Sequence, residues 1–123
     1  MSDKKTNYMT GMRLYGEGKN TEAIEAFEAA LAEDPEWGDC LQALSMAQMN
    51  SGDLETALAT SLRLTELTPT DPLAFTGLSM IYQRLDRIDD AETAQNKARM
   101  LSWKQELKEN PDTPPPMGIN VVQ

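Results

Sequence analysis

The chain has 123 residues, 40% of them hydrophobic and 25% charged, which is enough for one domain with a modest core. Acidic residues outnumber basic ones by 20 to 11, and the net charge of −9 argues against nucleic acid and anionic membrane surfaces as partners. The single cysteine excludes an intramolecular disulfide, and the absence of histidine removes the commonest metal ligand and the usual general base.

We expect neither catalytic residues nor a targeting signal in this sequence. Carboxylates such as Glu22 and Glu25 are spaced to lie on an outward helix face, where they are solvated charge. Cys40 has no visible partner base, and a buried apolar role is favoured for it. We therefore expect that the protein is not an enzyme and that it binds neither a cofactor nor a metal. The N-terminus lacks the apolar stretch of a secretory signal, and no run is long enough to cross a bilayer, so the expectation is a cytoplasmic protein without membrane insertion.

One spacing recurs through the sequence. A turn residue followed five positions later by alanine occurs three times, at Gly18–Ala23, Gly52–Ala57 and Asp86–Ala91. The distance from one copy of this pattern to the next also separates Pro35 from Pro69, and it separates the successive methionines Met12, Met46 and Met80. All of these series share one repeat period. Internal repetition at such a period is the mark of a helical repeat protein.

Each unit is predicted to contain two helices, one before the turn and one after it. The second helix of the first unit places Ala23, Phe27 and Ala30 on one face and ends before Pro35. Thr21 and Asp53 are the expected N-caps of the second and fourth helices, and Asp71 with Pro72 is expected to begin the fifth.

The last helix is predicted to be longer than the others. Trp103 stands where the first two units have a proline, so the helix can continue through roughly 89–109 until Asn110 and Pro111 stop it.

Alanine at the repeated positions allows the two helices of a pair to cross closely. No stretch alternates with a period of two, so the predicted fold class is all-α.

These residues resemble the signature of the tetratricopeptide repeat family, whose unit is a helix-turn-helix of the same period. The matches are Gly11, Leu14, Ala23, Phe27, Ala30 and Pro35 in unit one; Leu41, Leu44, Ser45, Ala57, Leu64 and Pro69 in unit two; Phe75, Leu78, Ser79, Tyr82, Ala91 and Ala98 in unit three. The resemblance implies tandem antiparallel helix pairs that form a right-handed superhelical α-solenoid. The expected domain spans 1–109, with three repeats at about 4–37, 38–71 and 72–105, and a Pro-rich, apolar tail follows at 110–123.

The resemblance also implies that the first helix of each pair lines a concave groove that binds a peptide. Carried over by position, the groove residues are Tyr8, Met9, Met12, Tyr15, Gln42, Met46, Met49, Asn50, Thr76, Met80, Gln83 and Arg84, with Lys5, Asp39, Ala43, Leu73 and Gly77 at neighbouring positions. The repeated methionines suit a groove for an apolar or helical segment. The alternatives are that these methionines only fill gaps between helices or that they form a surface for self-association.

A charged clamp for acidic C-termini, known in co-chaperone members of the family, is not expected here. The matching positions are Tyr8, Met12, Ala43, Leu73 and Gly77, and none of them carries a charge.

The C-terminal part offers a second candidate interface. The long last helix carries an apolar stripe of Met100, Trp103 and Leu107, and beyond three prolines the tail becomes apolar again at Ile119, Val121 and Val122. We expect the proline segment to return the tail onto this stripe or a neighbouring groove, the alternative being a terminus without a role.

The sequence therefore favours a non-enzymatic protein–protein interaction module, an adaptor, assembly factor or chaperone-like protein that binds a peptide or helix of a partner in the methionine-lined groove. The alternative is a structural subunit or homo-oligomer, such as a homodimer, that uses the C-terminal helix and tail as its interface.

Overall fold

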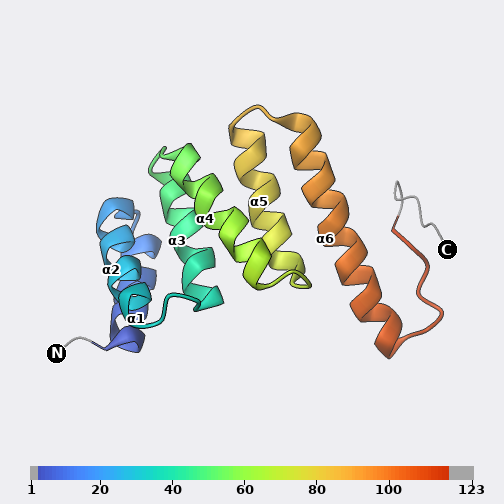
Figure 1. Cartoon of the computed structure of the whole chain (residues 1–123), viewed down its shortest axis with the longest axis horizontal. Coiled ribbons are helices and arrows are strands. Elements are labelled where there is room, and N and C mark those ends of the chain that lie inside the picture. Colours follow the sequence, from blue (N-terminus) through green and yellow to red (C-terminus); the bar gives the residue numbers. More distant parts are fainter. Residues whose placement is uncertain (1–2, 117–123) are drawn as a thin grey trace.

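The computed structural model describes residues 3–116, which contain six α-helices and no strand. In chain order the helices are α1 (Lys4–Gly16), α2 (Asn20–Glu33), α3 (Gly38–Asn50), α4 (Leu54–Leu67), α5 (Pro72–Arg84) and α6 (Ile88–Glu109). They follow one another along the long axis of the molecule as three antiparallel pairs (Figure 1). The all-α class, the three pairs and the long last helix are confirmed.

Side-chain caps mark where three of the six described helices, α1, α4 and α5, begin. Asp53 accepts a hydrogen bond from the backbone N–H of Thr56, and Asp71 accepts one from the N–H of Leu73, so both expected caps are confirmed. The cap expected at Thr21 is wrong. Helix α2 begins at Asn20, directly after Lys19, and no side chain caps it, because Thr21 already lies inside the first turn.

Small side chains hold the two helices of each pair close together. Ala23, Ala57 and Ala91 are all buried on the second helices. On the facing first helices the corresponding small residues are Gly11, Ser45 and Ser79, which are buried as well. The Ser79 hydroxyl donates a hydrogen bond of 2.8 Å to the backbone carbonyl of Ala91, which satisfies that polar group inside the last pair.

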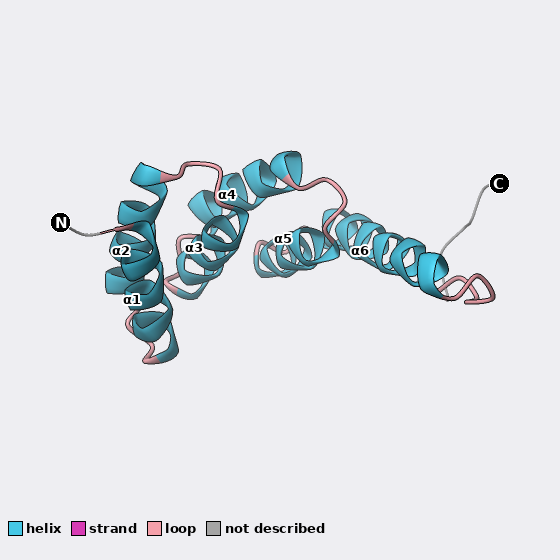
Figure 2. Cartoon of the chain, turned by 90° about the horizontal axis from the view of Figure 1, so that it is seen from below, coloured by secondary structure: helices cyan, strands magenta, loops and turns pink. Residues whose placement is uncertain are grey.

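The pairs stack so that their first helices lie on the inner side of a curve. Helix α3 contacts α1 and α5 contacts α3, whereas the second helices α2, α4 and α6 do not contact one another within residues 3–116. The molecule is therefore a curved α-solenoid whose concave face is lined by α1, α3 and α5. The stepwise displacement of the pairs is visible from below (Figure 2).

The core runs through the interfaces between pairs. Phe27 of α2 is fully buried between α1 and α3. Leu41 of α3 shares a core cluster with Leu64 and Ala74, and Leu31 packs against this cluster, so residues of all three pairs meet there. Helix α6, the second helix of the third pair, continues as far as Glu109, and the N–H of Thr113 then closes a turn on the carbonyl of Asn110.

Candidate functional site

The concave face contains a hollow between α1 and α3. Its volume is about 270 Å³, and we call it the first hollow. It is lined by Tyr8, Met12, Tyr15, Asp39, Gln42, Ala43 and Met46. Five of the predicted groove residues meet here, together with Asp39 and Ala43 from the neighbouring positions. The walls are aromatic and thioether side chains, with one carboxylate at the rim.

Aromatic packing and hydrogen bonds fix the tyrosine wall of the first hollow. The ring of Tyr8 lies 4.7 Å from that of Trp37 and 6.0 Å from that of Phe27, centroid to centroid. Burial, with the charge of Asp39 adding to it, raises the pKa of Tyr8, so its hydroxyl stays protonated at neutral pH. The Asn50 amide donates to the hydroxyl of Tyr15 at 3.1 Å, which ties the end of α3 to α1.

A second hollow lies between α3 and α5, with a volume of about 200 Å³. It is lined by Met49, Met80, Gln83 and Arg84, all of them predicted groove residues. Met80 is 44% exposed, whereas Met49 is only 5% exposed and packs against the core, so it forms the floor. The two hollows place three of the exposed or half-buried methionines, Met12, Met46 and Met80, on the same concave surface.

Three other predicted groove residues line neither of these hollows: Met9, Thr76 and Asn50, whose side chain bonds to Tyr15 instead. Met9 is 69% exposed on α1 and lines neither of them. Thr76 lines a different hollow, formed with α6.

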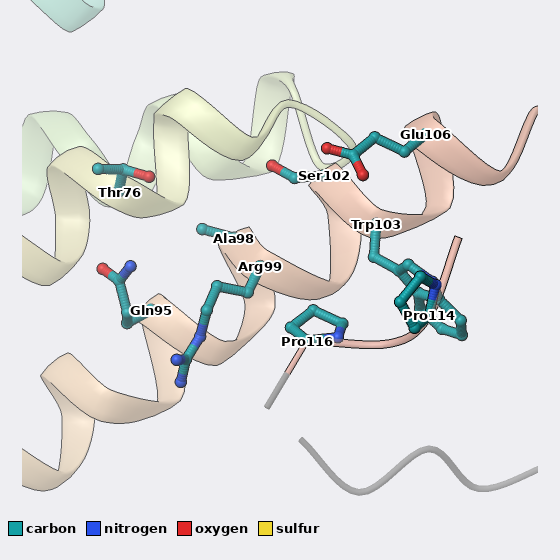
Figure 3. Close-up of a pocket in the computed structure, with 9 residues that line it drawn as sticks. All are labelled: Thr76, Gln95, Ala98, Arg99, Ser102, Trp103, Glu106, Pro114 and Pro116. Atoms are coloured by element: carbon teal, nitrogen blue, oxygen red, sulfur yellow. The ribbon is translucent and has the colours of Figure 1, made fainter. Parts of the chain in front are cut away.

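A third hollow, of about 350 Å³, lies at the C-terminal end of the solenoid (Figure 3). It is lined by Thr76, Gln95, Ala98, Arg99, Ser102, Trp103, Glu106, Pro114 and Pro116. The indole N–H of Trp103 donates a hydrogen bond of 3.0 Å to the carbonyl of Thr113, so the chain after α6 returns to its own helix.

The predicted second interface is thus divided. Trp103 lines the third hollow, whereas Met100 and Leu107 are half-buried elsewhere on α6. Ile119, Val121 and Val122 lie outside the described residues. Sequence reasoning missed Gln95, Ala98 and Ser102, which line this hollow with Trp103. They lie one repeat period after Ser61, Leu64 and Thr68, and that spacing is a signal that could have identified them.

The one thiol is unsuited to nucleophilic chemistry. Cys40 is fully buried, and burial raises its pKa to about 11, with a smaller contribution from the charge of Asp34. Its sulfur lies 3.5 Å from the carbonyl oxygen of Phe27. Over residues 3–116, no group of three or more metal-ligating side chains is assembled. In the same part of the chain, no helix is long and apolar enough to span a membrane.

A family model, described as the tetratricopeptide repeat, matches residues 14–81, more than half of the chain. The chain belongs to the tetratricopeptide repeat family. The resemblance drawn from the repeat period is therefore confirmed.

Relatives of similar sequence include the photosystem I assembly proteins Ycf3 of Synechococcus sp. strains WH7803 and CC9902. Each is 26% identical over 114 residues, which cover 85% of this chain and 65% of the relative. The tetratricopeptide chain described here thus spans somewhat less than two thirds of the length of these relatives.

Solved structures share the fold. The crystal structure of MamA has a TM-score of 0.79 at 18% identity and covers 85% of this chain and 61% of its own. The Yersinia enterocolitica type III secretion translocator chaperone SycD has a TM-score of 0.78 at 19% identity, with 86% and 81% covered. A chain of the CopN–Scc3 complex has a TM-score of 0.76 at 20% identity, with 86% and 65% covered.

Proposed function

We propose that this tetratricopeptide repeat protein is a non-enzymatic adaptor, of the assembly-factor or chaperone type, that holds an apolar segment of a partner protein on its concave face. The observation that carries the proposal is the pair of methionine-lined hollows between α1, α3 and α5. They lie on one surface and are built by the first helices of three successive repeats.

Exposed methionine on this surface favours a binding role over a filling role. Met12 is 43% exposed, and Met80 is 44% exposed. A side chain that only filled a gap between helices would be buried, as Met49 is. A flexible, polarisable thioether that remains exposed can adapt to apolar side chains of different shapes.

The size of the hollows supports a peptide or helix as the ligand. Their volumes, about 270 and 200 Å³, fall below the roughly 300–1,000 Å³ typical of small-molecule sites. Each hollow accommodates one or two side chains. A segment that places apolar residues in both hollows would be held by anchors spaced along its length.

The charges at the two hollows define the ligand more closely. Asp39 lines the first hollow, and Arg84 lines the second. A segment with a basic residue near Asp39 and an acidic residue near Arg84 would pair with both, which fixes its direction along the face. The proposed ligand is therefore an apolar segment with opposite charges at its ends.

The relatives provide independent support for the class of function. Two are named as assembly proteins, and one structural neighbour is named as a translocator chaperone. The alternative, a subunit that joins copies of itself through Trp103, is not favoured, because the indole N–H of Trp103 already bonds to the chain's own Thr113.

Two methionines of the same helix provide a matched test. Met12 lines the first hollow, whereas Met9 is exposed outside it. Met12→Glu places a desolvated charge against the partner and should weaken binding at least about tenfold, while Met9→Glu should change affinity less than about twofold. Partners captured from native extract by the wild-type chain would be identified, and the affinity of each purified partner for the variants measured by calorimetry.

The same pair of variants also provides a control for loss of binding through unfolding. Both side chains are exposed, so both variants should melt within a few degrees of the wild type. Equal affinity of Met12→Glu and Met9→Glu for every captured partner would contradict the groove proposal. A partner lost equally from both variants would instead place the binding surface on the outer side of α1.

A further inference from the structure

A further hollow lies on α6, apart from the concave face. It has a volume of about 240 Å³ and is lined by Thr70, Leu101, Lys104, Gln105 and Lys108. It shares no residue with the two concave hollows or with the third hollow. We call it the basic hollow, because the described residues that line it carry two ammonium groups and no carboxylate.

The basic hollow exists because α6 is longer than the other second helices. Helix α4 ends at Leu67, and the residue one repeat period later on α6 is Leu101. Since α6 continues to Glu109, the three hollow residues after Leu101 have no helical equivalent in the earlier pairs. The Gln105 side-chain amide donates to the carbonyl of Thr70 at 3.4 Å, which joins this extension to the loop between α4 and α5. The repeat itself therefore does not account for the chemistry of the extension.

Three lysines of α6 share the face that carries the basic hollow. Lys97, Lys104 and Lys108 are separated by seven and then four residues, spacings that return to one side of a helix. Like charges four residues apart repel each other, so Lys104 and Lys108 destabilise the isolated helix. Within residues 3–116 none of the three lysines forms an ion pair. A carboxylate bound beside them would remove the repulsion.

The carboxylates nearest in sequence lie on other sides of α6. Glu106 lines the third hollow, and Glu109 is more than a quarter turn away from Lys108 around the helix axis. The net charge of −9 is spread over the whole chain. At about 0.1 M salt the Debye length is about 10 Å, so carboxylates on distant helices are screened, whereas a carboxylate in contact with the lysines is not.

Leu101 adds an apolar contact between the positive charges. It is 7% exposed and lies on the same face of α6, after Lys97 and before Lys104. The volume of about 240 Å³ accommodates one large apolar side chain above it. Acidic residues before and after such a side chain would meet Lys97 on one side and the other two lysines on the other. This pattern fits a polypeptide better than a lipid surface, whose headgroups supply charge without an apolar anchor.

We propose that the basic hollow binds an acidic segment of a partner protein, in which one apolar side chain has carboxylates before and after it. The apolar side chain covers Leu101, and the carboxylates pair with Lys97, Lys104 and Lys108. The hollow is separate from the concave face, so it can be occupied while the concave hollows hold a segment of their own.

Synthetic peptides test the basic hollow on the full chain. The probe is a blocked peptide of five residues, a leucine between two pairs of aspartates. Extended, it spans about 17 Å, and the helical rise from Lys97 to Lys108 is also about 17 Å. Two matched peptides replace all the aspartates with asparagine or the leucine with serine. NMR titration in 0.1 M salt follows the Leu101 methyls and the Gln105 side-chain amide, with the Met12 and Met80 methyls reporting on the concave face.

The aspartate peptide should shift the signals of Leu101 and Gln105 and leave those of Met12 and Met80 in place. Each matched peptide should bind at least about fivefold more weakly, because it lacks either the charges or the apolar anchor. Shifts at Met12 and Met80 in place of Leu101 would assign the peptide to the concave face, and equal binding of the three peptides would remove the basis of recognition. Either result overturns the proposal.

Two double variants locate the charges that matter. Lys104→Gln with Lys108→Gln should weaken binding of the aspartate peptide about fivefold. Arg13→Gln with Lys19→Gln removes the same charge from exposed side chains at the other end of the solenoid and should change affinity less than about twofold. Equal weakening by both would show that net charge alone governs binding and would overturn the proposal.

Two other occupants of the basic hollow are tested with the same proteins. Phosphatidylserine vesicles that cosediment with the wild type but not with Lys104→Gln, Lys108→Gln, in the absence of peptide binding, would assign the hollow to a membrane surface. Leu101 and Gln105 signals of the wild type that shift on dilution would place a second copy of the chain there. Either finding would overturn the proposal of an acidic partner segment.

Discussion

At Gly11, helix α1 lies close against the Phe27 ring of α2. A Cβ added there would lie 2.5 Å from Cδ1 and Cε1 of the Phe27 ring. The ring is fully buried and packed by Tyr8, so it has little room to move. The close approach explains why this position holds glycine where the second and third units hold the serines 45 and 79.

Gly11→Ala should lower the free energy of unfolding by about 1–3 kcal/mol, because the added methyl forces Phe27 or the backbone to shift. Gly16→Ala is the matched control on the same helix. A Cβ there meets nothing within 4 Å, and the better helix propensity should stabilise by about 0.5–1 kcal/mol or leave stability unchanged. Urea unfolding measures both, and equal stability of the two variants would contradict the close packing.

At the level of single residues, exposure on the concave face could be predicted only in part. Met12 and Met80 each follow a small residue that the repeat pattern turns into the core, so their exposure could be inferred from the sequence. The burial of Met49 could not, since it depends on how closely α5 of the next repeat approaches α3. The local periodicity of the sequence does not predict the distance between α5 and α3.

The turns between the helices of each pair follow one pattern with one exception. Gly18 and Gly52 have positive φ angles of 78° and 93°. Asp86 occupies the equivalent position between α5 and α6 with a φ of 61°. A left-handed conformation is costly for a residue with a Cβ, although aspartate tolerates it better than most.

Asp86→Gly should therefore raise the free energy of unfolding by about 0.5–1 kcal/mol, because glycine adopts the left-handed conformation without steric cost. The reciprocal change, Gly52→Asp, should lower it by about 1 kcal/mol. Thermal unfolding of the two variants and the wild type gives the order of their stabilities. If Asp86→Gly were the less stable protein, a contact of the carboxylate would outweigh the backbone strain.

At the level of elements, the helices were more predictable than the surfaces they leave open. Prolines at 35, 69 and 72 and the turn residues fix the helix ends by local chemistry, so the sequence contains that information. The third hollow is open because no helix within residues 3–116 covers the last pair. Its residues Gln95 and Ala98 look ordinary until the equivalent positions of the covered pairs are compared in three dimensions.

At the scale of the whole molecule, stability depends on how the pairs are coupled. In a solenoid each pair contacts only its neighbours, and cooperativity comes from the interfaces between them. Leu41 lies where the three pairs come together. It is 2% exposed and shares a cluster with Leu31 of the first pair, Leu64 of its own and Ala74 of the third. A cavity at this point weakens both interfaces at once.

Leu41→Ala should lower the free energy of unfolding by about 2–5 kcal/mol. It should also split the single unfolding transition into two, because the outer pairs lose their common contact. The two tryptophans report on different ends: Trp37 lies between the first two pairs, and Trp103 lies on α6. Their indole NMR signals, followed through a urea titration, should coincide in the wild type and separate in the variant.

Leu101→Ala is the matched control, a buried leucine of the same size on the terminal helix α6. Its cavity should loosen the last pair and shift the Trp103 transition, while the signal of Trp37 keeps the wild-type midpoint. If the two tryptophan transitions stayed coincident in Leu41→Ala, the pairs would be coupled by the remaining contacts of α3 with α2, α4 and α5, and Leu41 would be one packing residue among many.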